Sequence, residues 1–162
     1  MPRLIPALGM CLLVACGRPE PEVTLRAAGA PIYSSAVVDL GRLEGDWQQV
    51  ATFAPGGRAD CAPGAVRIQG GAAEWRLCLA GGVAQGAGML EPGLPGRFGV
   101  AGMDEWWVLW IDADDRTALV GTPGGGFAFV LNRGGALPPD RLQAVRDIAV
   151  FNGYRAGDLA LF

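Results

Sequence analysis

The stretch Leu43-Glu44-Gly45-Asp46-Trp47-Gln48-Gln49-Val50-Ala51-Thr52-Phe53 decides the fold, because it reads as the first strand of a β-domain. It opens with a Gly two residues before a Trp. The Gly allows the incoming chain to turn tightly, and the large indole beside it can plug one end of a closed sheet. Period-2 alternation puts Gln49, Ala51 and Phe53 on the same face as the Trp. We therefore predict that Trp47 plugs a barrel and that these three side chains face its interior.

The composition fits one globular domain made of β-strands. Of the 162 residues, 51% are apolar and 18% are charged, which is ordinary for a single folded unit. The 26 Gly and 12 Pro stand in short groups, which indicates frequent turns between short strands. The formal charge of −3 is mild, and the Arg residues form no cluster among aromatics. Nucleic acid is therefore not expected as a partner.

The basic residues exclude much of the catalytic repertoire. All 13 are Arg, so the chain lacks imidazole bases, His ligands for zinc or haem, and Lys for Schiff bases. An enzyme would need paired carboxylates, and none is evident inside the proposed barrel. We therefore expect no catalytic residues, no cofactor and no metal.

The N-terminus reads as an export signal. Residues 1–15 carry one charge, Arg3, and an apolar run from Leu4 to Val14, which is about half the roughly 20 residues of a membrane-spanning helix. The end, Leu13-Val14-Ala15-Cys16, resembles the lipobox of bacterial lipoproteins, in which the Cys is acylated and becomes the new N-terminus. Ordinary secretory cleavage beside an incidental Cys is the alternative. Gly17 after the Cys favours the periplasmic side of the outer membrane.

The chain after the lipid anchor divides into a tether and a domain. Residues 16–35 are rich in Pro, Ala and Gly with scattered charge, which predicts a tether. The folded domain is expected at 36–162.

The two remaining cysteines, Cys61 and Cys78, predict a disulfide, because an exported protein meets an oxidising compartment. A hairpin that turns at Gln69-Gly70 brings the two cysteines opposite each other. In this register Trp75 and Leu77 share the inward face, and the cysteines lie on the outer face. A reactive thiol is the alternative.

The second half of the chain predicts more strands and then one helix. Residues 105–111 and 116–121 form the clearest hairpin, around the acidic turn 112–115, and 127–133 is another strand. Residues 106–111 are apolar on both faces, so their inward face stays undecided and a cover over the outer face is expected. Pro138-Pro139 opens an amphipathic helix that ends at Asn152-Gly153 and docks outside the barrel.

Several motifs together resemble the bacterial lipocalins. They are Gly45-Asp46-Trp47, Trp107-Val108-Leu109-Trp110-Ile111-Asp112-Ala113-Asp114, Thr117-Ala118-Leu119-Val120-Gly121 and Leu131-Asn132-Arg133, the last before a C-terminal helix. The resemblance covers about Val37 to Leu161. It implies an all-β fold: an eight-stranded antiparallel up-and-down barrel with one C-terminal α-helix. It also implies that Arg133 lies against Trp47 and closes the barrel, a contact that cation–π attraction favours. The chain departs from the family at Gln48, where an aromatic residue is common.

By this resemblance, the barrel binds a small hydrophobic ligand such as a fatty acid or a lysophospholipid, for storage or transport at the cell envelope. The expected ligand-binding residues are Gln49, Ala51, Phe53, Trp75, Leu77, Trp107, Leu109, Phe127 and Phe129, and barrel closure is assigned to Gly45, Trp47 and Arg133. The alternative is a structural or partner-binding envelope lipoprotein whose barrel is filled by its own Trp and Phe side chains. The sequence leaves ligand identity and oligomeric state open.

Overall fold

The structure is a computed structural model that describes residues 24–162. The predicted signal peptide, Cys16 and the first part of the predicted tether lie outside the described residues. Among the helices from residue 24 onward, none is both long and apolar enough to cross a membrane.

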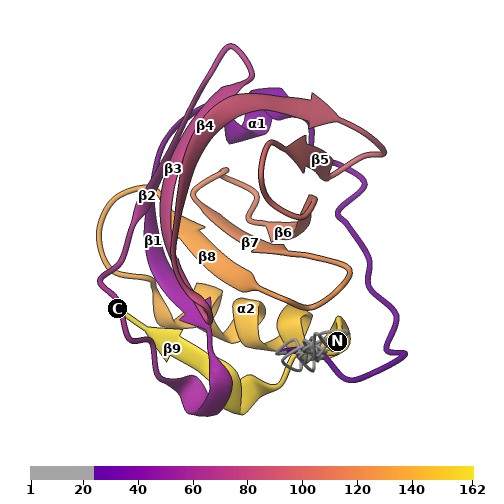
Figure 1. The fold of residues 1–162 in the computed structure, drawn as a ribbon, viewed down its shortest axis with the longest axis vertical. Helices are drawn as coiled ribbons and strands as arrows, with labels where there is room; N and C mark the ends of the chain where they lie inside the picture. The colour runs from indigo at the N-terminus through magenta and orange to yellow at the C-terminus, as the bar shows by residue number, and fades with distance from the viewer. Residues whose placement is uncertain (1–23) are drawn as a thin grey trace, which may run out of the picture.

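Eight antiparallel strands form the barrel (Figure 1). Their bounds are β1 Gly45–Phe53, β2 Ala65–Gln69, β3 Ala72–Leu79, β4 Gly82–Pro92, β5 Arg97–Val100, β6 Trp106–Ile111, β7 Thr117–Gly121 and β8 Ala128–Asn132. Consecutive strands pair, and β1 pairs with both β2 and β8, which closes the sheet. The predicted up-and-down barrel is therefore confirmed.

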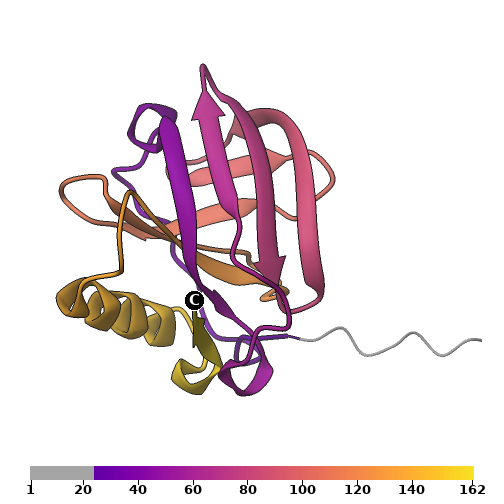
Figure 2. The ribbon, with the colours of Figure 1, turned by 90° about the vertical axis from the view of Figure 1, so that its left-hand side faces the viewer.

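The structure has the one predicted helix and, before β1, a helical turn that the sequence did not predict. A single turn, α1 (Leu40–Leu43), leads into β1, and Asp39 caps it by accepting a hydrogen bond from the Arg42 amide. The helix α2 (Pro139–Phe151) begins at the expected Pro pair and lies outside the barrel (Figure 2). Two short 3-10 turns, Pro55–Gly57 and Ala156–Asp158, follow β1 and α2. The last strand, β9 (Leu159–Leu161), pairs with β1 next to β8.

Two separate hydrophobic clusters hold the fold together. The first, here called the interior cluster, lies inside the barrel and contains Trp47, Val66, Ile68, Trp75, Leu77, Leu90, Phe98, Trp106, Val108, Val120, Phe127, Phe129 and Leu131, among others. The second, called the helix-side cluster, lies between the barrel wall and α2 and contains Leu25, Ala51, Phe53, Leu109, Leu119, Ala128, Val130, Val145, Ala149 and Tyr154. The apolar stripe of α2 thus covers one side of the barrel, as predicted.

A bulge in β1 reverses the expected orientation of its second half. Gln49 is opposite Leu131, whose side chain is in the interior cluster, whereas Ala51 is opposite Val130 in the helix-side cluster. The extra residue between them, Val50, shifts the register, so every later side chain points to the opposite face. The prediction that Ala51 and Phe53 face the interior is therefore wrong.

A second bulge, in β6, decides the face that the sequence left open. The register with β7 shifts between Val108 and Trp110. Trp106 and Val108 belong to the interior cluster, whereas Leu109 and Trp107 are on the helix side. The assignment of Trp107 and Leu109 to the interior is therefore wrong, and α2 is the expected cover of the outer face.

The Cys61–Cys78 disulfide is confirmed, with the two Cα atoms 5.6 Å apart. The hairpin that carries it turns at Gly70-Gly71, since Gln69 pairs with Ala72. This register is two residues away from the predicted one, and an even shift leaves the inward and outward faces unchanged. Trp75 and Leu77 accordingly face the interior, as predicted.

The predicted boundary between tether and domain at residue 36 is wrong for the part of the tether that the structure describes. Leu25 is fully buried in the helix-side cluster. Arg26 donates from Nε to the Asn152 carbonyl at 2.8 Å and from Nη1 to the Pro123 carbonyl at 2.6 Å. Residues 24–35 therefore belong to the folded domain, because one apolar side chain and one guanidinium fasten a segment whose composition is typical of a linker.

Candidate ligand-binding site

The base of the barrel is closed by Trp47 and Arg133. The guanidinium carbon lies 3.9 Å from the centre of the indole ring, and the indole Nε1 donates to the Leu43 carbonyl at 2.8 Å. Gly45 has a φ of 108°, and a Cβ there would come within 3.1 Å of Arg133 Nη1. The Gly thus provides both the turn and the room for the guanidinium, and all three barrel-closing residues lie together as predicted.

The middle of the barrel is filled by aromatic side chains. The Trp75 and Trp106 rings meet edge to face at 5.9 Å between centres, and Trp106 meets Phe129 at 5.4 Å. Phe129 stacks on Phe127 at 5.9 Å. Trp106 is 2% exposed and Phe129 and Leu77 are fully buried, whereas the walls of a hollow barrel would have accessible surface. At this level the interior is packed like a core.

The inner face of β4 is the exception, because it carries almost no side chains. Its inward positions, identified by their partners on β3, are Gly82, Ala84, Gly86 and Gly88, and Leu90 is the first large one. A Cβ at Gly82 would have no heavy atom within 4 Å, whereas a Cβ at Gly86 would clash with the Trp75 ring. The Trp75 ring therefore occupies the space of a missing side chain in mid-strand, and space stays open near Gly82.

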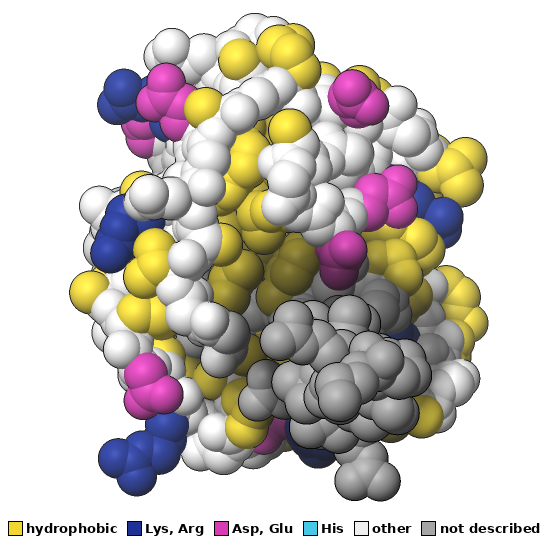
Figure 3. All heavy atoms as spheres, in the orientation of Figure 1, with side chains coloured by type: hydrophobic (Ala, Val, Ile, Leu, Met, Phe, Trp, Pro, Cys, Tyr) yellow, Lys and Arg dark blue, Asp and Glu magenta, His cyan; other side chains and the backbone are white. Residues whose placement is uncertain are grey.

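The wall beside this face is incomplete. β5 is four residues long, and its pairing with β4 is confined to Leu90, Glu91 and Pro92. Residues 82–89 pair with β3 and with no other strand of the described chain. Figure 3 shows this side of the molecule hollowed in the area framed by β4, β5 and β7, with apolar side chains on the floor of the hollow. The wall of the barrel therefore lacks a strand partner along residues 82–89 of β4.

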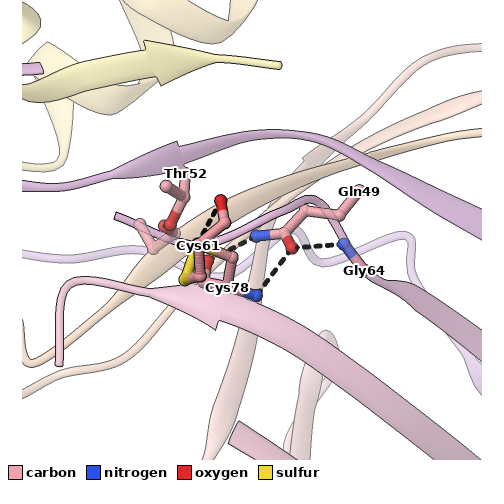
Figure 4. Close-up of a disulfide and its surroundings, with 6 residues drawn as sticks. Gln49, Thr52, Cys61, Gly64 and Cys78 are labelled. Carbon is pink, nitrogen blue, oxygen red and sulfur yellow. Dashed lines mark hydrogen bonds between the residues drawn. A yellow bond between two sulfur atoms is a disulfide. The ribbon is translucent and has the colours of Figure 1, made fainter. Parts of the chain in front are cut away.

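Gln49 of β1 is on the same side of the sheet as the interior cluster, but its side-chain amide is already hydrogen bonded within the protein. Its Oε1 accepts from the amides of Gly64 and Cys78 at 3.0 and 2.8 Å, and its Nε2 donates to the Cys78 carbonyl at 2.7 Å (Figure 4). These bonds link β1 directly to β3 in front of the start of β2, beside the disulfide. Gln49 therefore seals the barrel wall, and the interpretation of its side chain as a ligand contact is wrong.

Of the nine expected ligand-binding residues, the structure brings four together in the interior cluster: Trp75, Leu77, Phe127 and Phe129. The interior residues that sequence reasoning missed include Trp106 and Phe98. Alternation alone could have found Phe98 in its short strand. Trp106 was hidden because its strand is apolar on both faces.

Two polar atoms in the interior cluster lack partners. The indole Nε1 atoms of Trp75 and Trp106 are inaccessible to solvent and donate no hydrogen bond within the described chain. Leaving a buried donor unpaired costs about 1–3 kcal/mol. The indole of Trp47 at the base, by contrast, has the Leu43 carbonyl as its acceptor.

A groove of about 960 Å³ is lined by residues of β1, β2, β3 and β4 and by Arg133 and Gly134. Its rims carry outward side chains such as Asp46, Arg67 and Glu74. Asp46 and Arg67 form an exposed ion pair at 2.6 Å. The lining also contains Trp47, Val66 and Trp75, which belong to the interior cluster, and Arg133 at the barrel base.

An eight-stranded up-and-down barrel, sealed at one end and flanked by one helix, belongs to the class of small barrels that can hold one apolar molecule. The family model described as a lipocalin-like domain matches residues 96–161. This match covers the second half of the barrel and the helix α2, and the chain as a whole has the lipocalin fold. Members of this family are in general binding and transport proteins rather than enzymes, and the fold is typical of proteins that bind small hydrophobic ligands.

Solved structures of similar fold cover most of the chain. Lipocalin 12 from rat epididymis has a TM-score of 0.57 and 13% identity, over 86% of this chain and 92% of that chain. The major allergen Per a 4 from cockroaches has a TM-score of 0.54 and 10% identity, over 82% and 92%. The siderocalin Ex-FABP, described as functioning through dual ligand specificities, has a TM-score of 0.52 and 14% identity, over 75% of this chain and 89% of that chain. By sequence, the chain matches no curated protein significantly.

Proposed function

We propose that this protein binds a small hydrophobic ligand against the inner face of β4, and that the ligand carries an acyl chain, as a fatty acid or a lysophospholipid does. The observation that carries the proposal is the bare inner face at Gly82, Ala84 and Gly86, which lies next to the aromatic cluster and beside an incomplete wall.

The driving force is the transfer of the acyl chain out of water, at about 0.8 kcal/mol per buried CH₂. In a closed core, large inward side chains on β4 would fill the space beside this strand. Here the open space near Gly82 admits the first part of a chain, and deeper entry requires the Trp75 ring to leave the backbone of Gly86.

A chain-length series tests the proposal. The dissociation constant of fatty acids should fall with each added CH₂ until the space beside Gly82, Ala84 and Gly86, here called the recess, is full. Replacing the open Gly82 is unsuitable because its φ is 110°, so Ala84→Leu is the informative variant: it fills the recess and should weaken binding. Val83→Leu, on the exposed outer face of the same strand, is the matched control. A dissociation constant that does not change with chain length defeats the proposal.

A second candidate function is supported by the filled middle of the barrel. Trp75, Trp106 and Phe129 pack against one another and are buried, as in a structural or partner-binding protein. Native mass spectrometry of the protein extracted from its own membrane separates the two candidates. A retained lipid-sized mass supports ligand binding, and a bare protein mass together with a co-purified partner supports the second candidate.

We further propose that the protein functions at the cell envelope, anchored by lipid on Cys16 at the periplasmic side of the outer membrane. The support is the sequence Leu13-Val14-Ala15-Cys16 after an apolar run. Metabolic labelling with radioactive palmitate should label the wild-type protein and not Cys16→Ala. Equal labelling of both, or of neither, contradicts the anchor.

A further inference from the structure

The interior cluster contains two hydrogen-bond donors and no acceptor for either. Trp75 and Trp106 come from opposite sides of the barrel, on β3 and β6, and their rings meet edge to face. Both Nε1 atoms are buried and unpaired in the described chain. A Phe at either position would be apolar without this cost, so the two N–H groups are polar features in an otherwise apolar cluster.

One of these donors lies beside the incomplete wall. The Trp75 atoms nearest to a Cβ built on Gly86 are Cζ2 at 2.5 Å and Cε2 at 3.0 Å. The third is Cη2 at 3.2 Å, so the six-membered ring of the indole lies against the bare strand, and Nε1 is bonded to one of these atoms, Cε2. Trp75 therefore lies between the inner face of β4 and Trp106, whose ring it contacts.

The charge of the interior decides which acceptor fits. The side chains packed around Trp75 and Trp106 are apolar, and the guanidinium of Arg133, whose Nε is also buried and unpaired, is held over Trp47 at the base. Burying a carboxylate without a cation costs far more than burying a neutral carbonyl that is hydrogen bonded.

We propose that the ligand presents a neutral oxygen acceptor, such as the carbonyl of a ketone or an ester, to the indole N–H groups of Trp75 and Trp106. This inference rests on the proposed function, because it requires a ligand in the barrel. It sharpens that function by placing an esterified or otherwise uncharged acyl compound ahead of a free carboxylate.

The competing explanation is that each N–H points at the face of a neighbouring ring. The edge-to-face geometry of Trp75 on Trp106, and of Trp106 on Phe129, is compatible with such weak contacts. In that case the donors would stay unchanged when a carbonyl ligand binds, so the two explanations give different results.

The test compares octane, 2-octanone and octanoate on the intact protein at neutral pH. The measured quantity is the ratio of ketone affinity to alkane affinity, because any change in cavity volume affects both ligands alike. Trp75→Phe and Trp106→Phe should each lower this ratio by roughly tenfold or somewhat less, the effect of one lost hydrogen bond. Trp107→Phe, on the outer face and bonded to Glu105, is the matched control and should leave the ratio unchanged.

Nitrogen–proton NMR spectra give a direct readout. The indole resonances of Trp75 and Trp106, assigned from the Phe variants, should shift downfield on addition of 2-octanone and stay in place with octane. Octanoate should bind more weakly than 2-octanone.

The possible outcomes distinguish a failure of the neutral-acceptor proposal from a failure of the proposed ligand-binding function. If octane binds but neither Phe variant changes the ketone-to-alkane ratio, the acceptor proposal is overturned and hydrophobic binding stands. If octanoate binds best and depends on both indoles, the neutral character of the acceptor is wrong. If none of the three compounds binds, the proposed function itself fails.

Discussion

The interior cluster and the helix-side cluster are both buried, but they differ in how their polar atoms are satisfied. In the helix-side cluster, the Tyr154 hydroxyl accepts from the Thr122 amide at 3.1 Å and donates to the Phe127 carbonyl at 3.0 Å. In the interior cluster, the indole donors of Trp75 and Trp106 have no acceptor. The difference teaches that the helix-side cluster is a complete structural core, whereas the interior cluster keeps two buried hydrogen-bond donors without acceptors, the feature on which the proposed ligand contact rests.

Truncation of Phe53 should give the largest loss of stability and should affect the helix-side cluster alone. Phe53 is fully buried and lies 5.3 Å from the Tyr154 ring in the helix-side cluster. Phe53→Ala should lower the free energy of unfolding by about 3–5 kcal/mol, through lost burial and the cavity left behind. Urea denaturation measures the loss. The Phe53→Ala molecules that stay folded should bind the ligand as the wild type does, whereas Phe127→Ala in the interior cluster should alter binding. Lost binding in a stable Phe53→Ala protein would contradict the assignment of Phe53 to the helix-side cluster.

The disulfide should have the next largest effect, since it fastens the wall between the interior cluster and solvent. Cys61 and Cys78 are 17 residues apart, and the double substitution to Ala should cost about 3 kcal/mol in the chain-entropy account. The midpoint of guanidinium denaturation, with and without a reductant, measures this. A double variant as stable as the wild type would mean that the Gln49 hydrogen bonds to the Cys78 backbone hold the wall by themselves.

Alkaline pH should weaken the helix-side cluster through Tyr154. Burial raises the pKa of Tyr154 from 10.0 to about 12, opposed by hydrogen bonding to Thr122. The folded-state pKa is higher than the unfolded one, so the stability that comes from the neutral, buried phenol is fully present below about pH 10. It is lost as the pH rises from about 10 toward about 12, at about 1.4 kcal/mol for each unit of difference between the two pKa values. Stability measured across this range should fall by about 2–3 kcal/mol. Tyr154→Phe should remove this fall, and a variant with an unchanged pH profile would refute the assignment.

The closure of the barrel base should have the smallest effect. Arg133→Met removes the guanidinium over Trp47 and should cost about 0.5–2 kcal/mol, the usual range of a cation–π contact. Thermal unfolding and the emission of the indoles measure this change. Arg116→Met, at an exposed position on the neighbouring turn, is the matched control and should stay within about 0.5 kcal/mol of the wild type.

Most of the fold could be predicted from the sequence, because it depends on local signals. The Gly-x-Trp opening, the acidic turn at 112–115 and the Pro pair before α2 each act within a few residues. The two-residue error in the hairpin register did not change which side chains were predicted to face inward, because an even shift keeps each residue on the same face of the sheet. The buried docking of Leu25 and Arg26 could not be predicted, because their partners lie about a hundred residues away.

The candidate site was predicted less well, because alternation was counted through the bulge in β1 and because β6 is apolar on both faces. Val50 adds a residue to β1 and turns Phe53 to the helix side, whereas in β6 only the pairing with the neighbouring strands places Trp106 inside and Trp107 outside. A bulge has no sequence signature comparable to that of a turn, so its position depends on how the neighbouring strands pair.

By itself, the sequence determined that this protein is a small barrel with a Trp plug, a disulfide and one covering helix, since strand alternation, turn residues and cysteine spacing are local properties. The tertiary structure alone decided which aromatic side chains face inward, that the middle of the barrel is filled, and that two indole donors there lack acceptors. The physical reason is that burial and hydrogen-bond satisfaction depend on what a side chain meets from other strands, and those neighbours exist only once the sheet has closed.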